Sequence, residues 1–219
     1  TTIATDADCD GVITEDDCDD ADANLGSIFI DTNCDGIYYV ETFSSGNYYN
    51  CGIDENGSVQ CWGYNDDGQS SPPSDSFLQV SAGGYHSCGI DSSGSVQCWG
   101  WDGAGQVSDA PSGNFVQVSS GGGHSCAIDS NGSVQCWGRD DDGQVTDTPS
   151  GSFVQVAAGV WHTCGIDSSG TVQCWGIDSG YEWDGNYGQV TDTPSGSFVQ
   201  VSAGESHSCA IDFDGSVQC

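Results

Sequence analysis

The chain has 219 residues, and its 33 acidic side chains against one basic one, Arg139, give a formal net charge of −32. This balance excludes nucleic acid as a partner, because phosphate binding needs lysine and arginine, and it disfavours anionic membrane surfaces for the same reason. The sequence also has 13 cysteines, no methionine and no apolar run of bilayer-spanning length. We therefore expect a secreted protein with paired cysteines, processed from a precursor and not inserted in a membrane.

The N-terminal segment, residues 1–36, is predicted to be an Asp-rich calcium-binding arm. Residues 6–17 place acidic side chains at positions 1, 3, 5 and 12 of a calcium loop, with Gly11 at position 6 for the sharp turn. Position 12 is aspartate rather than glutamate, which shortens its reach. The candidate ligands of this loop are Asp6, Asp8, Asp10, Val12, Thr14 and Asp17.

Two looser versions of this pattern follow, with candidate ligands Asp20, Asp22, Asn24 and Asp31, and then Asp31, Asn33 and Asp35. The segment resembles the aspartate-rich metal-binding repeats of secreted bacterial proteins and of thrombospondin type 3 modules. A disordered acidic arm is the alternative, but the regular spacing and the interspersed cysteines favour structural calcium. We expect Cys9 to pair with Cys18, and Cys34 to be free or linked to another chain.

Residues 37–219 consist of repeats of one unit, with boundaries at 37–75, 76–113, 114–151, 152–196 and 197–219. The clearest copy begins at Phe77 and reads FLQVSAGGYHSCGIDSSGSVQCWG. The first cysteines of successive copies lie 37, 38, 38 and 45 residues apart. Each copy holds three short alternating runs separated by glycine-rich turns, and none shows helical periodicity. These features predict an all-β, propeller-like array of about five blades.

The last two runs of each copy form a predicted hairpin closed by a disulfide. In the second copy a short turn places Gly94 where left-handed backbone is required, so that Cys88 lies directly opposite Cys98. Zinc bound by thiolates fits badly, because closely spaced cysteine pairs are absent. The same register predicts the bonds Cys51–Cys61, Cys88–Cys98, Cys126–Cys136, Cys164–Cys174 and Cys209–Cys219.

The repeat resembles that of the regulator of chromosome condensation family. The shared motifs are Gly-x-x-His, an Asp-x-x-Gly hairpin, Trp-Gly and a following Gly-Gln, seen for example at Gly83, His86, Trp99 and Gln106. The resemblance implies four-stranded blades around an axis, usually seven of them, whereas this sequence supplies four full repeats and most of a fifth. It implies no single activity, since such propellers serve as an exchange factor, a photoreceptor and a β-lactamase inhibitor.

Several polar residues have simple structural interpretations. The four histidines occupy one position in successive copies, so we expect each to satisfy a buried backbone group rather than to bind a metal. Turn chemistry accounts for aspartate-rich turns such as 140–142, with ion binding as the alternative. Asn56 and Asn131 begin glycosylation sequons at predicted hairpin tips and should be exposed; their use depends on the host.

The fourth copy is seven residues longer than the third between Gly176 and Gln189, and this insertion carries Tyr181, Trp183 and Tyr187. Insertions in repeat proteins often lie on the binding face. Aromatic side chains there can stack on sugar rings or dock against a protein, which makes these three residues candidate partner contacts. The alternative is that they fold back over a neighbouring blade.

The apolar run Ser27, Ile28, Phe29 and Ile30 is a predicted strand without a partner in its own repeat, and the last repeat lacks Trp-Gly. If this strand completes the fifth repeat of a neighbouring copy, a filament results; within one chain it closes a ring. The leading hypothesis is a non-catalytic extracellular structural or adhesion protein, stabilised by calcium and disulfides, that assembles with itself. A discrete secreted propeller that binds a carbohydrate or a protein, including enzyme inhibition, is the alternative. No catalytic set can be singled out, so a hydrolase ranks third.

Overall fold

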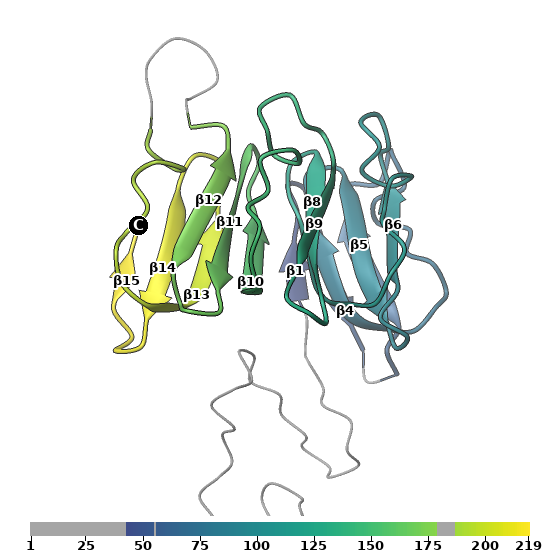
Figure 1. The fold of residues 1–219 in the computed structure, drawn as a ribbon. Helices are drawn as coiled ribbons and strands as arrows, with labels where there is room; N and C mark the ends of the chain where they lie inside the picture. The colour runs from purple at the N-terminus through teal and green to yellow at the C-terminus, as the bar shows by residue number, and fades with distance from the viewer. Residues whose placement is uncertain (1–42, 55, 179–186) are drawn as a thin grey trace, which may run out of the picture. The chain divides into compact units, whose positions relative to one another are not determined.

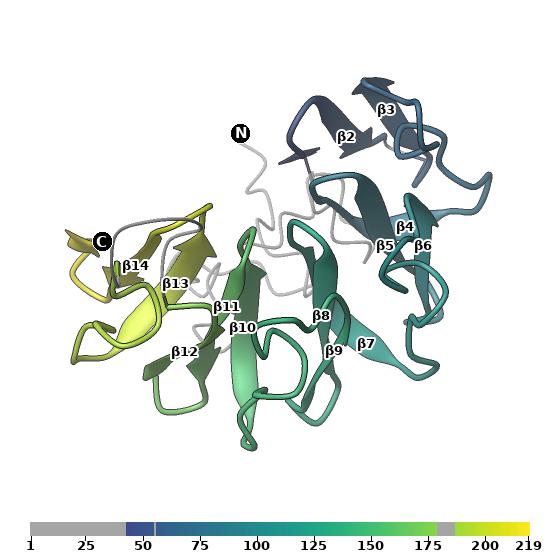
Figure 2. The same cartoon turned by 90° about the horizontal axis from the view of Figure 1, so that it is seen from above.

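The computed structural model describes residues 43–54, 56–178 and 187–219. The strands in this part of the chain form five antiparallel sheets, one per repeat, each with its three strands in chain order. Residues 42–219 make one compact unit, in which the five blades follow one another side by side (Figures 1 and 2). The blades comprise β1–β3 (Phe43–Ser45, Tyr49–Ile53, Val59–Gly63), β4–β6 (Phe77–Ala82, His86–Asp91, Val96–Gly100), β7–β9 (Phe115–Ser120, His124–Asp129, Val134–Gly138), β10–β12 (Phe153–Ala158, His162–Asp167, Val172–Gly176) and β13–β15 (Phe198–Ala203, Ser208–Asp212, Val217–Gln218).

The prediction of an all-β array of about five propeller-like blades is confirmed, but the blades have three strands rather than the four that the resemblance implied. After β3, β6 and β9 the chain forms turns instead of a fourth strand. In the third blade the Asp140 carboxylate accepts hydrogen bonds from the backbone N–H groups of Val145 and Thr146, at 2.8 and 2.9 Å. Because these donors are satisfied by a side chain, no ladder with a fourth strand is needed.

The hairpin register and the five predicted disulfides of the blades are confirmed. Cys88 pairs with Cys98 across β5 and β6, and the same bond recurs in every blade. Gly94 has a φ of +81°, the left-handed conformation that its place in the turn requires. The Asp91 carboxylate closes the turn by accepting from the N–H groups of Ser93 and Ser95. The predicted Cys9–Cys18 bond lies outside the described residues.

The hydrophobic core lies between the blades. One cluster joins Cys88 and Ile90 of the second blade to Phe115, Val118 and Trp137 of the third, and equivalent clusters occur at the neighbouring junctions. The disulfide of each of these blades is therefore packed against the next blade, so hairpin stability and blade stacking depend on the same side chains.

Polar contacts repeat at the same junctions. The Trp137 indole N–H donates to the backbone carbonyl of Gln106 in the preceding loop, at 3.0 Å. On the inner strands, the Gln79 side-chain oxygen accepts from the N–H of Val118 at 2.8 Å. Each blade thus fixes the position of the next through both apolar burial and hydrogen bonds.

The glycine of Gly-x-x-His is required by this close stacking. A Cβ on Gly83 would lie 2.5 Å from the carbonyl oxygen of Gly121 in the next blade, closer than real Cβ contacts allow. The adjacent Gly84 N–H donates to that same carbonyl at 2.9 Å. The motif therefore marks the point where neighbouring backbones touch near the axis.

Candidate binding site

Two positions in each of the first four blades lie on one side of the array. One is the residue before the histidine of Gly-x-x-His, and the other is the residue after Trp-Gly. A backbone hydrogen bond from the second residue to the first holds them next to each other in the first four blades. The pairs are Tyr48 and Tyr64 (3.0 Å), Tyr85 and Trp101 (2.9 Å), Gly123 and Arg139 (2.9 Å), and Trp161 and Ile177 (3.1 Å).

Six of these eight residues, all but Tyr64 and Ile177, line a recess with a volume of about 680 Å³, which we call the aromatic recess. Its rings come from Tyr48, Tyr85, Trp101 and Trp161, and its acidic groups include Asp67. Tyr85 is 38% exposed and Trp101 is 41% exposed. Large rings left this accessible, together with polar groups, are characteristic of a surface that contacts another molecule.

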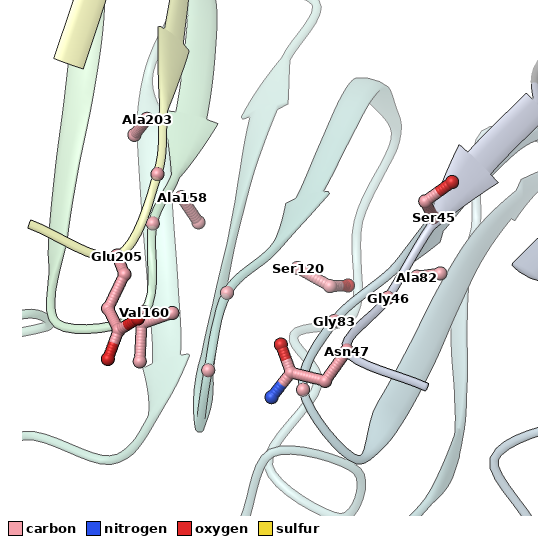
Figure 3. A pocket seen from close by; sticks show the side chains of 15 residues that line it. Ser45, Gly46, Asn47, Ala82, Gly83, Ser120, Ala158, Val160, Ala203 and Glu205 are labelled. Carbon is pink, nitrogen blue, oxygen red and sulfur yellow. The ribbon is translucent and has the colours of Figure 1, made fainter. Parts of the chain in front are cut away.

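A second cavity of about 300 Å³ lies next to the recess. Its lining consists mainly of glycine and other small residues of the turns between first and second strands, and the two cavities share Asn47, Gly122, Val160 and Glu205. Figure 3 shows Val160 and Glu205 on one side of this opening and Asn47 on the other. The recess is thus the larger of two adjacent cavities that share part of their lining.

Arg139 lies across one side of the recess. Its guanidinium carbon is 4.6 Å from the centre of the Trp161 ring, and its Nε donates to the Asp141 carboxylate at 2.7 Å. The third blade has Gly123 where the first, second and fourth blades have a ring, and the stem of Arg139 packs over it. The arginine therefore combines a ring contact with an ion pair, the arrangement expected of a cation–π site.

On the opposite side, three tyrosines pack edge to face. The ring centres of Tyr48 and Tyr64 are 6.2 Å apart, and those of Tyr64 and Tyr85 are 6.4 Å apart. The pKa of Tyr64 is raised, by desolvation first and then by the negative charges of Asp66 and Asp67. Tyr64 packs between Tyr48 and Tyr85 but is not part of the lining, so on this side the recess itself presents the rings of Tyr48 and Tyr85 and the carboxylate of Asp67.

The buried histidines are structural, but the partner expected for them is wrong. His86, His124 and His162 are fully buried, and their Nε2 atoms each lie 2.7 Å from the hydroxyl of a serine or threonine in the next blade, not from a backbone group. Stacking brings the two side chains together, which sequence spacing could not show. Burial lowers the pKa of His86 and His162 to about 4 and that of His124 to about 3.

A histidine next to a hydroxyl is also the arrangement of a general base and a nucleophile. Here the pair recurs in three junctions, and both His86 and its partner Ser125 have no exposed surface. No hydrogen-bond partner for Nδ1 of these histidines occurs among the described residues, so the group that would orient a catalytic base is not seen there. The repetition and the burial identify these pairs as contacts between blades.

Other predicted residues have mixed outcomes. Asn56 and Asn131 are exposed at hairpin tips, as expected. Tyr187 is 54% exposed but does not line the recess. Three predictions lie outside the described ranges. They are the calcium ligands between Asp6 and Asp35, the strand at 27–30, and the partner contacts Tyr181 and Trp183. Within those ranges the structure contains neither a cluster of three metal-binding side chains nor an apolar helix of membrane-spanning length.

Sequence reasoning missed the aromatic recess. The available signal was variation between the repeats: the residue before the histidine is Tyr85 in one copy, Gly123 in the next and Trp161 in the one after, within otherwise similar segments. A position that accepts glycine does not need a ring for folding, so a ring there is available for contact with a partner.

The fifth blade exposes the polar side chains that earlier blades use to form hydrogen bonds with the next blade. Gln200, Ser202 and His207 are exposed, whereas the equivalent Gln117 and Ser119 of the third blade accept hydrogen bonds from N–H groups of the fourth. None of these three side chains has a hydrogen-bond partner in the described part of the chain. The fifth blade can thus receive another blade through the same set of groups.

The repeat motifs match the family model for the regulator of chromosome condensation (RCC1) repeat at residues 40–69, 77–106, 115–144, 153–189 and 198–219. A search of the curated proteins finds no match.

Solved structures with a similar fold include plant receptor ectodomains. The ectodomain of the Physcomitrella patens receptor kinase CR4 is 29% identical, with a TM-score of 0.65 over 81% of this chain and 49% of that one. The CRINKLY WD40 ectodomain of the Arabidopsis thaliana receptor kinase ACR4 is 27% identical, with a TM-score of 0.63 over 80% of this chain and 61% of that one.

Human WBSCR16 shares the fold alone. It is 20% identical, with a TM-score of 0.67 over 81% of this chain and 62% of that one. The chain thus spans between about half and three-fifths of the length of these structures. Because the repeat model matches five segments that together make up most of the sequence, the chain belongs to the regulator of chromosome condensation repeat family.

Proposed function

We propose that this chain is an extracellular, non-catalytic binding module that contacts its partner through the aromatic recess. The observation that carries the proposal is the gathering of exposed rings, Tyr48, Tyr85 and Trp101, at positions where the fold does not require them. Aromatic residues in such hollows provide much of the binding free energy of many interfaces. The disulfide in each blade and the similarity to two receptor ectodomains support a location outside the cell.

The proposal is tested by probing arrays of glycans and of secreted-protein peptides with the purified chain. The test variant is Tyr85→Ala/Trp101→Ala, and the matched control is Phe213→Ala, which removes a 75% exposed ring on the fifth blade outside the recess. We expect at least one ligand that binds to the native chain and to the control but not to the double variant. Equal binding of every ligand by the double variant would contradict a role for the recess.

A second candidate function, self-association into a head-to-tail polymer, is favoured by the two end blades. The fifth blade offers Gln200, Ser202 and His207, as described above. The first blade offers Trp62, which is 51% exposed although the equivalent Trp99 is 7% exposed against its neighbour. The first blade of one copy could therefore bury its tryptophan on the fifth blade of another, forming a heterologous contact that repeats.

Sedimentation velocity over a range of protein concentrations, with electron microscopy of the same samples, tests this second candidate. We expect oligomers that disappear in a Ser202→Tyr variant, because the larger side chain blocks the face, and persist in Phe213→Ala. A native chain that sediments as one discrete particle at all concentrations rules the polymer out. Repeating the measurement after chelation shows whether calcium contributes, as the N-terminal sequence predicts.

A further inference from the structure

We propose that the aromatic recess binds a cationic side chain, such as an arginine in a basic segment of a partner protein, against Tyr85, Trp101 and Asp67. This inference rests on the proposed function and adds the chemistry of the ligand. It is carried by the ring positions, by the place of the chain's own cation and by the charge of the surface.

The rings of this half of the recess are not needed by the fold. The position of Tyr85 is occupied by Gly123 in the third repeat and by Ser206 in the fifth, and Gly123 still makes the backbone hydrogen bond that pairs the two positions. Tyr85 and Trp101 nevertheless remain 38% and 41% exposed. Their rings therefore present faces that only another molecule would cover.

The one basic residue of the sequence shows what this surface accepts. Arg139 lies with its guanidinium over the Trp161 ring and its Nε on the Asp141 carboxylate. A planar guanidinium stacks on an aromatic face and pairs with a carboxylate at the same time, which lysine does less well. The recess thus already holds a cation between a ring and an acid at its fourth-blade side.

The tyrosine side of the recess has the same two components without a basic residue of this chain. Tyr48, Tyr85 and Trp101 supply the rings, and Asp67 supplies a carboxylate in the lining. Because Arg139 is the only lysine or arginine among 219 residues and is engaged elsewhere in the recess, a lysine or arginine side chain bound here must come from another molecule. A chain with a net charge of −32 also attracts cationic partners at long range and repels acidic ones.

A neutral sugar is the main competing ligand, because sugar rings also stack on aromatic side chains. Stacking of a sugar would make no use of the negative charge of Asp67 in the lining, whereas a guanidinium uses both the rings and the charge. The charge of the recess therefore favours a cation, and the experiment below separates the two ligands.

The test is isothermal titration calorimetry on the full chain with three probes at about 150 mM salt, where diffuse surface attraction is largely screened. The probes are a short peptide of alternating arginine and glycine, the same peptide with neutral citrulline for arginine, and a β-linked glucose hexasaccharide. We expect the arginine peptide to bind about tenfold more tightly than the citrulline peptide. Equal affinity for the two peptides overturns the inference, because their shapes match and only the charge differs.

Variants show where the peptide binds. Trp101→Leu leaves the net charge unchanged, so a loss of affinity of about tenfold for the arginine peptide reports the ring contact rather than general attraction. Asp67→Asn should weaken binding by about threefold. The matched control Phe213→Leu should bind like the native chain. Because Trp101 is partly exposed, its replacement should leave the unfolding midpoint unchanged, which a parallel urea titration checks.

The outcomes separate this inference from the proposed function. If the hexasaccharide or the citrulline peptide binds and Trp101→Leu abolishes that binding, the recess is a binding site but not one for cations. If the arginine peptide binds equally to the native chain and to Trp101→Leu, the cation inference is wrong. If none of the three probes responds to Trp101→Leu, the cation inference fails, and the array experiment alone decides the proposed function.

Discussion

Acid should destabilise this array through its three buried histidines, and replacing them with tyrosine should remove that sensitivity. His86, His124 and His162 have no exposed surface. The first blade already contains the proposed substitute, because Tyr49 occupies the histidine position there and its hydroxyl lies 2.9 Å from the Ser87 hydroxyl in the next blade. The triple variant His86→Tyr/His124→Tyr/His162→Tyr would repeat this contact without a group that gains a proton near neutral pH.

The direction of the effect follows from the pKa values. Burial lowers the pKa of the histidines from 6.5 to about 4 for His86 and His162 and to about 3 for His124. The unfolded chain therefore takes up protons first as the pH falls. Stability is complete above about pH 6.5 and declines as the pH approaches the folded value, by about 2 kcal/mol per histidine between pH 7 and pH 5. Three histidines together contribute a loss of about 6 kcal/mol over this interval.

Acidification also protonates carboxylates and reduces the net charge of −32, which relieves self-repulsion. Both proteins share that stabilising effect, so only the difference between them reports the histidines. The assay is urea unfolding with the disulfides intact, at both pH values, followed by the fluorescence of the buried Trp99, Trp137 and Trp175. We expect the native chain to lose about 6 kcal/mol more stability than the triple variant between pH 7 and pH 5. Equal losses would refute the reasoning; His162→Gln serves the same purpose if the triple variant does not fold.

Three further predictions concern stability and metal binding. Gly83→Ala should lower the free energy of unfolding, measured with urea, by about 1–3 kcal/mol, because its Cβ would meet a carbonyl oxygen of the next blade. Gly52→Ala should lower it by less than about 1 kcal/mol, because the nearest neighbour of its Cβ would lie at 3.9 Å. Equal losses for the two variants would contradict the argument from close approach. Replacing Cys88 and Cys98 with alanine should lower the free energy of unfolding by about 3 kcal/mol, because their bond closes a loop with a sequence separation of 10 in the unfolded chain. An unchanged urea midpoint would show that the bond does not constrain the unfolded chain. Asp10→Asn should weaken calcium binding by the full chain in calorimetry, and unchanged binding would contradict the predicted N-terminal loop.

The elements predicted correctly from sequence are those that depend on neighbours along the chain. Cys88 and Cys98 face each other because a short turn with a left-handed Gly94 fixes the register of one hairpin. Every residue in that argument lies within one repeat, so turn chemistry and strand alternation were sufficient. The recurrence of the same spacing in the other repeats then gave the number of blades.

The features that only the tertiary structure decided are those built between blades. Sequence indicated that His124 is structural, but its partner, the Thr163 hydroxyl, belongs to a different blade and lies 39 residues away. The aromatic recess likewise draws Tyr48, Tyr85 and Trp161 from three blades. Side chains this far apart in sequence meet only after the blades stack, and the stacking distance and angle depend on packing that no single repeat contains. The sequence therefore determined the blade, and the stacking of blades determined the site.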